Sequence, residues 1–368
     1  MSEDGLKLTT YFGERDRVGG RFSADALLDL YERHELAASV LLRGTEGFGM
    51  KHHLRTERLL TLSEDLPLVS VAVDARARIE RAVPEVLGLM RKGLVTLERA
   101  RLVTAPNDPD GLGGTRGPEA ATKLTVYCGR KERVGTRPAG LAVVELLRAH
   151  GVAGATCLLG VDGTTHGVRR RARFFGRNAD VPLMVIAIAP REAIAKVLPE
   201  LSGVLERPLL TFERVRICRR DGERIAPPPF EPEVDASGLG VWQKLTLHAS
   251  ADAAAGRGSL HGELIRRLRE EGASGVTAVR GIWGYHGDHE PHGDRLLSLR
   301  RRSPVVTTLI DRPARIRRWF GVVDELTAER GLVTVERVPA FRAGGPEGSR
   351  GGLELAAAPG VSAPASSG

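Results

Sequence analysis

Several features that would assign a protein to a common class are missing from this sequence. Aromatic residues make up only 4% of its 368 residues. The sequence has no apolar run of roughly 18 residues, the length that marks a membrane-spanning helix. The first residues, MSEDGLKLTTYFGERDR, are polar and charged, unlike a secretory signal. We therefore expect a cytoplasmic protein without membrane insertion.

Cysteines and catalytic motifs are also scarce. Cys128, Cys157 and Cys218 form no CxxC pair, which argues against a disulfide framework or a cysteine zinc site. In apolar, strand-like runs they are expected to be small buried hydrophobic residues. The sequence has no GxSxG, P-loop or HExxH motif. We therefore predict that the protein is not an enzyme.

Positive charge exceeds negative charge, but it is spread along the chain. There are 54 Lys and Arg against 46 Asp and Glu, which gives a net charge of +8. This excess suits a small anionic ligand such as a nucleotide phosphate. Sheets that bind RNA need aromatic side chains on their central strands. Because aromatic residues are few, we expect no nucleic-acid partner.

One unit recurs three times, and this is the strongest signal in the sequence. The copies open with KLTTYFGERDRVG, KLTVYCGRKERVG and KLTLHASADAAAG, and they close with LVTLERARLV, LLTFERVRIC and LVTVERVPA. Each copy is therefore one structural unit. A glycine loop follows the opening lysine at the same separation in every copy, pairing Lys7 with Gly44, Lys123 with Gly160 and Lys244 with Gly281.

Each copy has the pattern strand, helix, strand, strand, helix, strand. This order is the ferredoxin-like split unit, so we predict an α+β fold. Ser23 and Ser259 are expected N-caps of the first helices. We expect ferredoxin-like repeats at 7–103, 123–218 and 244–340, linkers at 104–122 and 219–243, and a disordered tail at 341–368.

The bare face of each sheet predicts contact between the repeats. Both helices of such a unit cover one face, yet the third strand LMVIAI at 183–188 is apolar at every position. That pattern is typical of burial on both faces. Three equal units can cover one another by closing a ring, so we predict a monomer that is an intramolecular pseudo-trimer. Three separate domains on linkers are the alternative.

Charged residues recur at matching ends of the first and last strands. The first strands carry Lys7, Lys123 and Lys244. Because first and last strands are neighbours in this topology, we expect cross-strand ion pairs. A ligand-binding role for the lysines is the alternative. The recurring acidic partners are Glu98, Glu213 and Glu336.

The glycine loops are candidate ligand sites. RGTEGFG, GVDGTTHG and RGIWGYHG share G-x-x-G and open the long excursions 44–66, 160–181 and 281–303. Glycine permits close backbone approach, which a phosphate cradle, a metal site and a tight turn all need. Long loops with basic residues on a rigid sheet often bind ligands. The candidate ligand-binding residues are Gly44, Gly47, Gly49, Arg55, Gly160, Gly163, Gly167, Arg169, Gly281, Gly284 and Gly287.

These motifs resemble those of a known family. In the first copy, KLTTYFGERDR, VLLRGTEGFG and GLVTLERARLV look like the uncharacterised family called domain of unknown function 190. The second copy is close, and the third has lost the basic residues of its first loop, SADAAAG. The family resembles the PII-like superfamily of trimeric signalling proteins.

That resemblance implies a ligand and a partner. PII-like proteins hold small ligands, often adenine nucleotides, in clefts between subunits beneath the loop after the second strand. The resemblance therefore implies an adenine nucleotide or similar anion as ligand. Genes of the family often lie beside fluoride-exporter genes, which implies a link to ion homeostasis and a membrane transporter, or another regulated protein, as partner.

The third glycine loop contains a histidine-rich segment. YHGDHEPHGD holds His286, His289 and His292. Imidazole and carboxylate ligands suit zinc, copper or nickel. Binding of a divalent metal is therefore the alternative function. Because Pro291 excludes a regular helix and the other copies lack the cluster, an exposed polar loop is the other interpretation.

Overall fold

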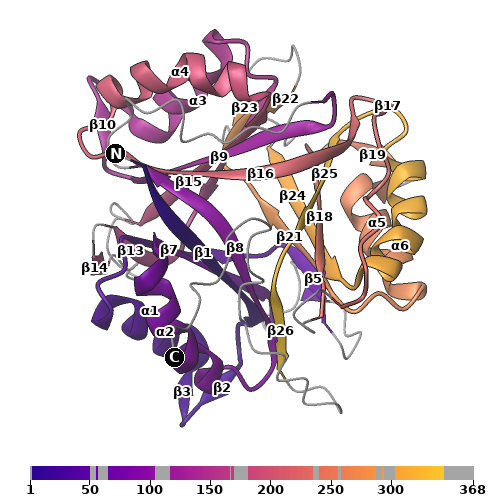
Figure 1. The fold of residues 1–368 in the computed structure, drawn as a ribbon, viewed down its shortest axis with the longest axis horizontal. Helices are drawn as coiled ribbons and strands as arrows, with labels where there is room; N and C mark the ends of the chain where they lie inside the picture. The colour runs from indigo at the N-terminus through magenta and orange to yellow at the C-terminus, as the bar shows by residue number, and fades with distance from the viewer. Residues whose placement is uncertain are drawn as a thin grey trace, which may run out of the picture.

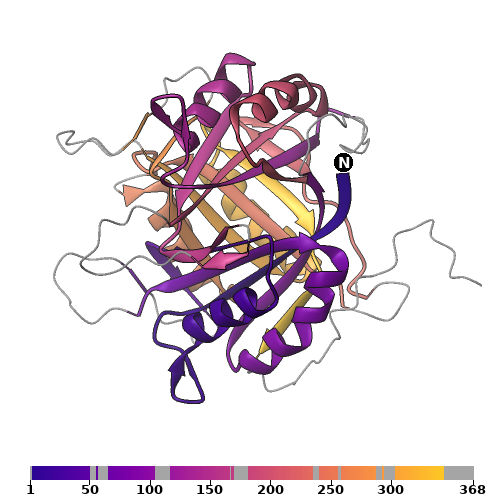
Figure 2. The ribbon, with the colours of Figure 1, turned by 90° about the vertical axis from the view of Figure 1, so that its left-hand side faces the viewer.

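Three groups of strands and helices surround a common centre (Figure 1). The computed structural model describes residues 2–49, 55–56, 65–103, 117–165, 167–169, 181–234, 240–255, 258–286, 292–293 and 303–343. Pairs of helices lie at the periphery and the strands run through the middle, as the view turned by 90° also shows (Figure 2). The described part is therefore mixed α+β, with six helices and one large curled antiparallel sheet.

The first repeat contains four long strands and two helices. They are β1 (Ser2–Gly13), α1 (Ser23–Arg33), β4 (Ala38–Arg43), β7 (Pro67–Ala75), α2 (Arg76–Leu89) and β8 (Gly93–Val103). Strand β1 lies between β7 and β8, and β4 pairs with the other edge of β7. The strand order is therefore β4-β7-β1-β8, with antiparallel neighbours throughout.

The second and third repeats have the same strand order. The second repeat contains β9 (Ala120–Gly129), α3 (Ala139–Ala149), β12 (Gly154–Leu159), β15 (Pro182–Ala189), α4 (Arg191–Val204) and β16 (Leu209–Arg220). The third contains β18 (Gln243–Ser250), α5 (Leu260–Glu270), β21 (Val276–Arg280), β24 (Pro304–Asp311), α6 (Pro313–Leu326) and β25 (Leu332–Arg337).

A short hairpin with two residues in each strand leads into the first helix of each repeat. One of the two predicted N-caps is confirmed and the other is wrong. Ser259 caps α5, since its hydroxyl accepts the N–H of Gly262 at 3.1 Å. Ser23 is instead the first residue of α1, and Phe22 is the N-cap without a side-chain hydrogen bond. The chain therefore enters α1 one residue earlier than its serine suggested. The hairpins are β2 (Arg17–Val18) with β3 (Arg21–Phe22), β10 (Arg133–Val134) with β11 (Arg137–Pro138), and β19 (Ala254–Ala255) with β20 (Gly258–Ser259).

Alternation along the first strand separates two faces of each sheet. In β1, Leu6 and Leu8 pack under the helices with Leu27 and Ile79. The intervening residues point to the opposite face, because successive strand side chains alternate. On that face the three repeats share one apolar cluster, so each sheet face left bare by helices is covered by the others. The cluster includes Val40 and Val71 from the first repeat, Leu158 and Met184 from the second, and Val279 and Val306 from the third.

The last strands also connect the repeats. The end of β8 pairs with the start of β16, with Val103 opposite Leu210. The end of β16 pairs with β25, with Arg216 opposite Val335. A final strand, β26 (Ala340–Ala343), returns to β8. The pairing therefore runs from the first repeat to the second, to the third and back to the first.

Strand β26 changes the predicted end of the structured chain. Residues 341–343, assigned by sequence to a disordered tail, form most of this strand. These residues are ordered by backbone pairing with the edge of β8, which their own composition does not predict. The rest of that tail, 344–368, lies outside the described residues.

The segments between repeats contribute to the fold where they are described. Strand β16 continues to Arg220 and forms a hairpin with β17 (Glu223–Arg224). Val241 and Trp242, just before β18, are buried. All three cysteines are free and buried, as expected. None of the helices in the described ranges is long and apolar enough to cross a bilayer.

Candidate functional site

Each glycine loop opens with a short hairpin after the second long strand. In the first repeat the hairpin is β5 (Glu46–Phe48) with β6 (Arg55–Thr56). In the second it is β13 (Asp162–Thr165) with β14 (Val168–Arg169), and in the third β22 (Trp283–His286) with β23 (His292–Gly293). The loops are therefore built as ordered strands at their bases.

The first strand of each hairpin pairs with another repeat. Strand β13 lies on β4 of the first repeat, β22 lies on β12 of the second, and β5 lies on β21 of the third. Each pairing covers the outer edge of a four-stranded sheet. The second strand of every repeat is thus extended by its neighbour, and no sheet edge at these positions is left open.

The first glycine of each loop starts the crossing between repeats. Gly44 donates its N–H to the carbonyl of Pro67 within the same repeat at 2.7 Å. The next residue, Thr45, donates its N–H to Ala278 of the third repeat at 2.9 Å. Val161 and Ile282 make the matching contacts in the other loops, with Leu41 and Cys157.

The second glycine of each motif lies where no side chain fits. A Cβ on Gly47 would lie 2.5 Å from the carbonyl oxygen of Val276 in the third repeat. A Cβ on Gly163 would overlap the carbonyl oxygen of Ser39, and one on Gly284 would overlap that of Ala155. Close approach between strands of two repeats is therefore a sufficient reason for G-x-x-G. That these glycines also contact a ligand remains a prediction.

The other predicted loop residues are less constrained. Nothing lies within 4 Å of a Cβ built on Gly49. Gly167 adopts a positive φ of 77°, a conformation that favours glycine. Arg55 lies in β6 opposite Gly47. Gly287 and His289 lie outside the described residues, and His286 and His292 belong to β22 and β23.

Arg169 is bound by three carboxylates at the junction of the first two repeats. Its guanidinium donates to Asp162 at 2.8 Å and to Asp25 of α1 at 3.3 Å, and it also pairs with Asp29. Arg21 pairs with Asp29 as well. Although partial burial opposes it, the hydrogen bond from Arg21 and the charge of Arg169 lower the pKa of Asp29. An anion at Arg169 would have to compete with these carboxylates.

The recurring lysines and glutamates meet at the centre of the molecule. Lys7 lies directly opposite Glu98, Lys123 opposite Glu213, and Lys244 opposite Glu336, so the predicted cross-strand pairs are confirmed. Each lysine also contacts the glutamate of another repeat. The contacts form a closed ring of alternating charge: Lys7 with Glu98 and Glu213, Lys123 with Glu213 and Glu336, Lys244 with Glu336 and Glu98.

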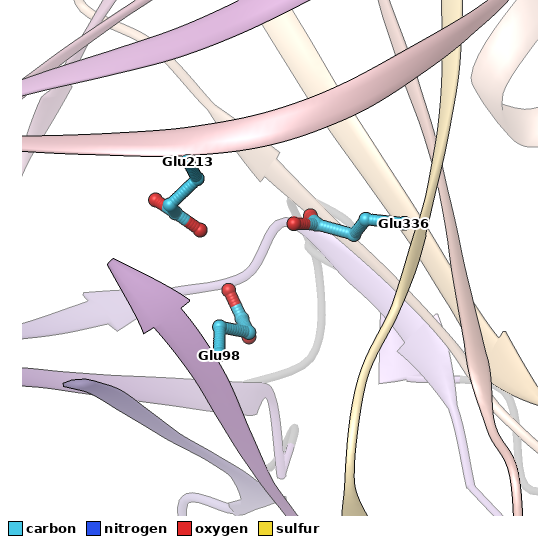
Figure 3. A group of neighbouring side chains, drawn as sticks. All are labelled: Glu98, Glu213 and Glu336. Atoms are coloured by element: carbon cyan, nitrogen blue, oxygen red, sulfur yellow. The ribbon is translucent and has the colours of Figure 1, made fainter. Parts of the chain in front are cut away.

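This charge ring is buried. Figure 3 shows its three glutamates converging from three different strands. The Lys123 ammonium lies 2.9 Å from Glu213 and 2.6 Å from Glu336. The six side chains are between 1% and 10% exposed. The three positive and three negative charges cancel, which is a condition for burying so many ions together.

Comparison with known sequences agrees with the repeat organisation. A family described as "Uncharacterized ACR", DUF190, matches three times, at residues 5–102, 121–217 and 242–340. The chain belongs to the DUF190 family. It is also similar to a UPF0166 protein of Aquifex aeolicus (strain VF5), with 36% identity over 76 residues, which is 20% of this chain and 70% of that protein.

The ring shifts the pKa of its members in opposite directions. Burial disfavours the Lys7 ammonium, but the carboxylates of Glu213 and Glu98 outweigh this effect and raise its pKa. Burial likewise disfavours the Glu98 carboxylate, yet Lys244 and Lys7 hold its pKa well below the ordinary range. The pKa of Glu336 is also lowered, by Lys123 and Lys244. All of these groups stay ionised at neutral pH.

The central glutamates of this DUF190 chain are close enough to suggest a cation site. Their carboxylate oxygens lie within 4.8 Å of one another. However, every glutamate is already in contact with two lysine ammonium groups. A metal ion between the carboxylates would also lie against these ammonium groups, which repel a cation. The geometry therefore favours an ion network over a metal centre.

Sequence analysis missed the contacts that cross between the DUF190 repeats. No motif or spacing in the sequence connects Asp25, Asp29 and Asp162, so their meeting at Arg169 was not predicted. The carboxylates belong to two repeats and meet only when β13 pairs with β4.

The first prediction concerns the glycine junctions. We expect Gly47→Ala to destabilise the protein by about 1–3 kcal/mol, the usual cost of forcing atoms into a packed site. Gly49→Ala is the matched control and should change little, because its Cβ meets open space. Urea unfolding measures both. Equal stability of the two variants would contradict the packing role of Gly47.

The second prediction concerns the ring. Glu98→Gln leaves excess positive charge in a buried cluster, so the free energy of unfolding should fall by about 3–5 kcal/mol. Glu85→Gln removes an exposed partner of Arg33 and His34 and should have no measurable effect. Denaturant titration of the three proteins tests this. A loss at Glu98 no larger than at Glu85 would show that the ring contributes little.

The third prediction concerns pH. The Glu98 and Glu336 carboxylates contribute stability that is complete above their unfolded pKa of about 4.3 and is lost as pH falls through their lower folded pKa. The lysines contribute stability that is complete below about pH 10.4 and is lost only at higher pH. We expect a flat contribution between these limits and a steep fall in acid. Urea midpoints from neutral pH to about pH 3 should fall less steeply for Glu98→Gln than for wild type, and parallel curves would refute the assignment.

Proposed function

We propose that this chain is a PII-like regulatory protein, a pseudo-trimer of three ferredoxin-like repeats that binds a small anionic ligand between repeats. One observation carries the proposal: the hairpin after each second strand lies on a neighbouring repeat. A ligand that contacts such a hairpin also contacts the neighbour's sheet edge. Binding can therefore change how two repeats are held together, which is what a signalling protein requires.

The three junctions offer different chemistry. At the junction of β13 and β4, three aspartates surround Arg169, so negative charge is already present. The loop that follows β5 carries Lys51, His52, His53, Arg55 and Arg58 in its sequence. We therefore assign the anion site to the junction of the first and third repeats, where β5 lies on β21.

The chemistry of phosphate recognition fits this junction. The planar guanidinium of arginine donates two parallel hydrogen bonds to a phosphate, and backbone N–H groups at the base of the hairpin can donate uncharged hydrogen bonds. An adenine nucleotide supplies phosphate and a planar base, and its recognition needs no catalytic group. A binding role without catalysis is therefore proposed, with a membrane transporter or another regulated protein as the partner that reads the bound state.

Binding of a divalent metal is the second candidate. The β22–β23 pairing places His292 opposite Gly284, two residues from His286. Diagonal positions on paired strands lie about 7–8 Å apart. The histidine-rich segment occurs in the third repeat alone, so the metal site would be single.

The fourth prediction separates these candidates by isothermal titration of the full chain with ATP, ADP, AMP and, separately, Zn²⁺. We expect saturable heat with at least one nucleotide. Arg55→Ala should weaken that binding about tenfold, the value of one charge-assisted hydrogen bond. Arg81→Ala, on the exposed side of α2, is the matched control and should bind like wild type.

The outcomes are distinct. If the heat of titration with each of the three nucleotides equals that with buffer alone, the nucleotide proposal is wrong. Saturable Zn²⁺ binding that Arg55→Ala leaves unchanged and His292→Ala abolishes would favour the metal alternative. Nucleotide binding that Arg55→Ala does not weaken would move the site away from the β5 loop.

A further inference from the structure

A cavity of about 80 Å³ lies between the inner faces of the three sheets. All three repeats contribute to its wall, including Thr9, Thr125 and Thr246 at equivalent positions of the first strands. The register of the strands divides this wall into three layers. Successive layers are two residues apart along each strand, which corresponds to about 7 Å.

The first layer is the lysine side of the charge ring. Lys7, Lys123 and Lys244 all line the cavity. An ammonium group has three N–H donors, and each lysine contacts two carboxylates. One N–H of each lysine is therefore left for another acceptor, and the three lysines meet at the same end of the cavity.

The second layer consists largely of threonines. Thr125, Thr246 and Thr334 are 1%, 6% and 3% exposed and line the cavity. Within the described ranges their hydroxyls have no hydrogen-bond partner, whereas Thr9 donates to Glu98 at 3.3 Å. Leaving a buried hydroxyl unpaired is unfavourable. These three hydroxyls are thus available to a polar group inside the cavity.

The third layer is mainly apolar. Leu42, Leu158, Val279 and Met184 form most of this part of the wall, and they belong to the apolar cluster shared by the three repeats. Tyr11 and His248 line the same layer. The cavity therefore has one end rich in N–H and O–H donors and one largely apolar end.

We propose that this cavity binds a small monocarboxylate of about two to four carbons, with the carboxylate between the lysines and threonines and the alkyl chain in the apolar layer. The size follows from comparison with a dry cavity of roughly 150 Å³ that holds benzene. The donors at one end match a group that only accepts hydrogen bonds, as a carboxylate does.

Charge restricts the ligand further. The ring is neutral, and Glu336 also lines the polar end. A phosphate would bring up to two negative charges close to this carboxylate, whereas a monocarboxylate brings one. A cation would face three ammonium groups. This site is separate from the hairpins of the proposed nucleotide site, so neither proposal depends on the other.

The fifth prediction uses propionate as the probe and the full chain as the protein. Saturable binding of propionate is expected by isothermal titration, together with broadening or shift of the carboxyl resonance of ¹³C-labelled propionate. Propionamide has nearly the same shape without the charge and should bind at least about tenfold more weakly.

Threonine variants test the placement. Thr125→Val with Thr246→Val removes two cavity hydroxyls and should weaken propionate binding by about tenfold or more. Thr10→Val is the matched control, since Thr10 is equally buried and lies next to Thr9 on β1, where alternation points it to the other face. The control variant should bind propionate like wild type.

Each result decides the proposal. Absence of saturable propionate binding by wild type overturns it, as does equal affinity for propionamide. Full affinity in the double valine variant would show that the carboxylate binds elsewhere. If that variant does not fold, the preference of wild type for propionate over propionamide remains the deciding measurement. Failure of nucleotide binding has no bearing on any of these results.

Discussion

The fold depends on six buried charges that are shared between repeats. Each lysine of the ring contacts one glutamate on its own sheet and one on another sheet. Removing any repeat would therefore take one of the two partners from a lysine and from a glutamate of the other repeats, and an incompletely paired buried ion is strongly unfavourable. Apolar packing in the same centre is non-directional and tolerates rotation of one sheet against another. The alternating charges do not tolerate such a rotation, because it would move like charges toward one another. The ring thus fixes the register in which the three sheet faces meet.

Backbone pairing reinforces the same arrangement at the edges. The hairpin after each second strand extends a neighbouring sheet in one direction around the centre, and the last strands connect the repeats in the other. Strand addition demands close approach, and Gly47, Gly163 and Gly284 provide it by lacking a Cβ. A motif that resembles a phosphate cradle in the sequence therefore has a structural reason of its own. The ligand site proposed at these hairpins uses a backbone geometry that assembly already requires.

The features that could be predicted from the sequence are those that depend on contacts within one repeat. Periodicity and repetition gave the α+β class, the element order and the pairing of Lys7 with Glu98, because register within a repeat is set by strands that the sequence identifies. The second partner, Glu213, was not predictable, since it depends on how separate sheets close around the centre. The same holds for Asp25 and Asp29 at Arg169, and for residues 341–343, whose strand exists only on the edge of β8. Ser23 failed as a cap because the hairpin β2–β3 delivers the chain to the helix one residue early.

Fusion of the three units allows them to differ where a trimer of identical chains cannot. In such a trimer every substitution appears three times around the centre, so a polar change in the cavity wall would carry a threefold cost. Here the third repeat has His248 where the others have Tyr11 and Tyr127, as the register of the first strands shows. It also has Thr308 where they have Val71 and Ile186. Yet Lys244, Glu336, Gly281 and Gly284 remain in this otherwise divergent copy. The residues that hold the repeats together are kept in all three copies, while the cavity wall differs in the third repeat, where His248 and Thr308 line it.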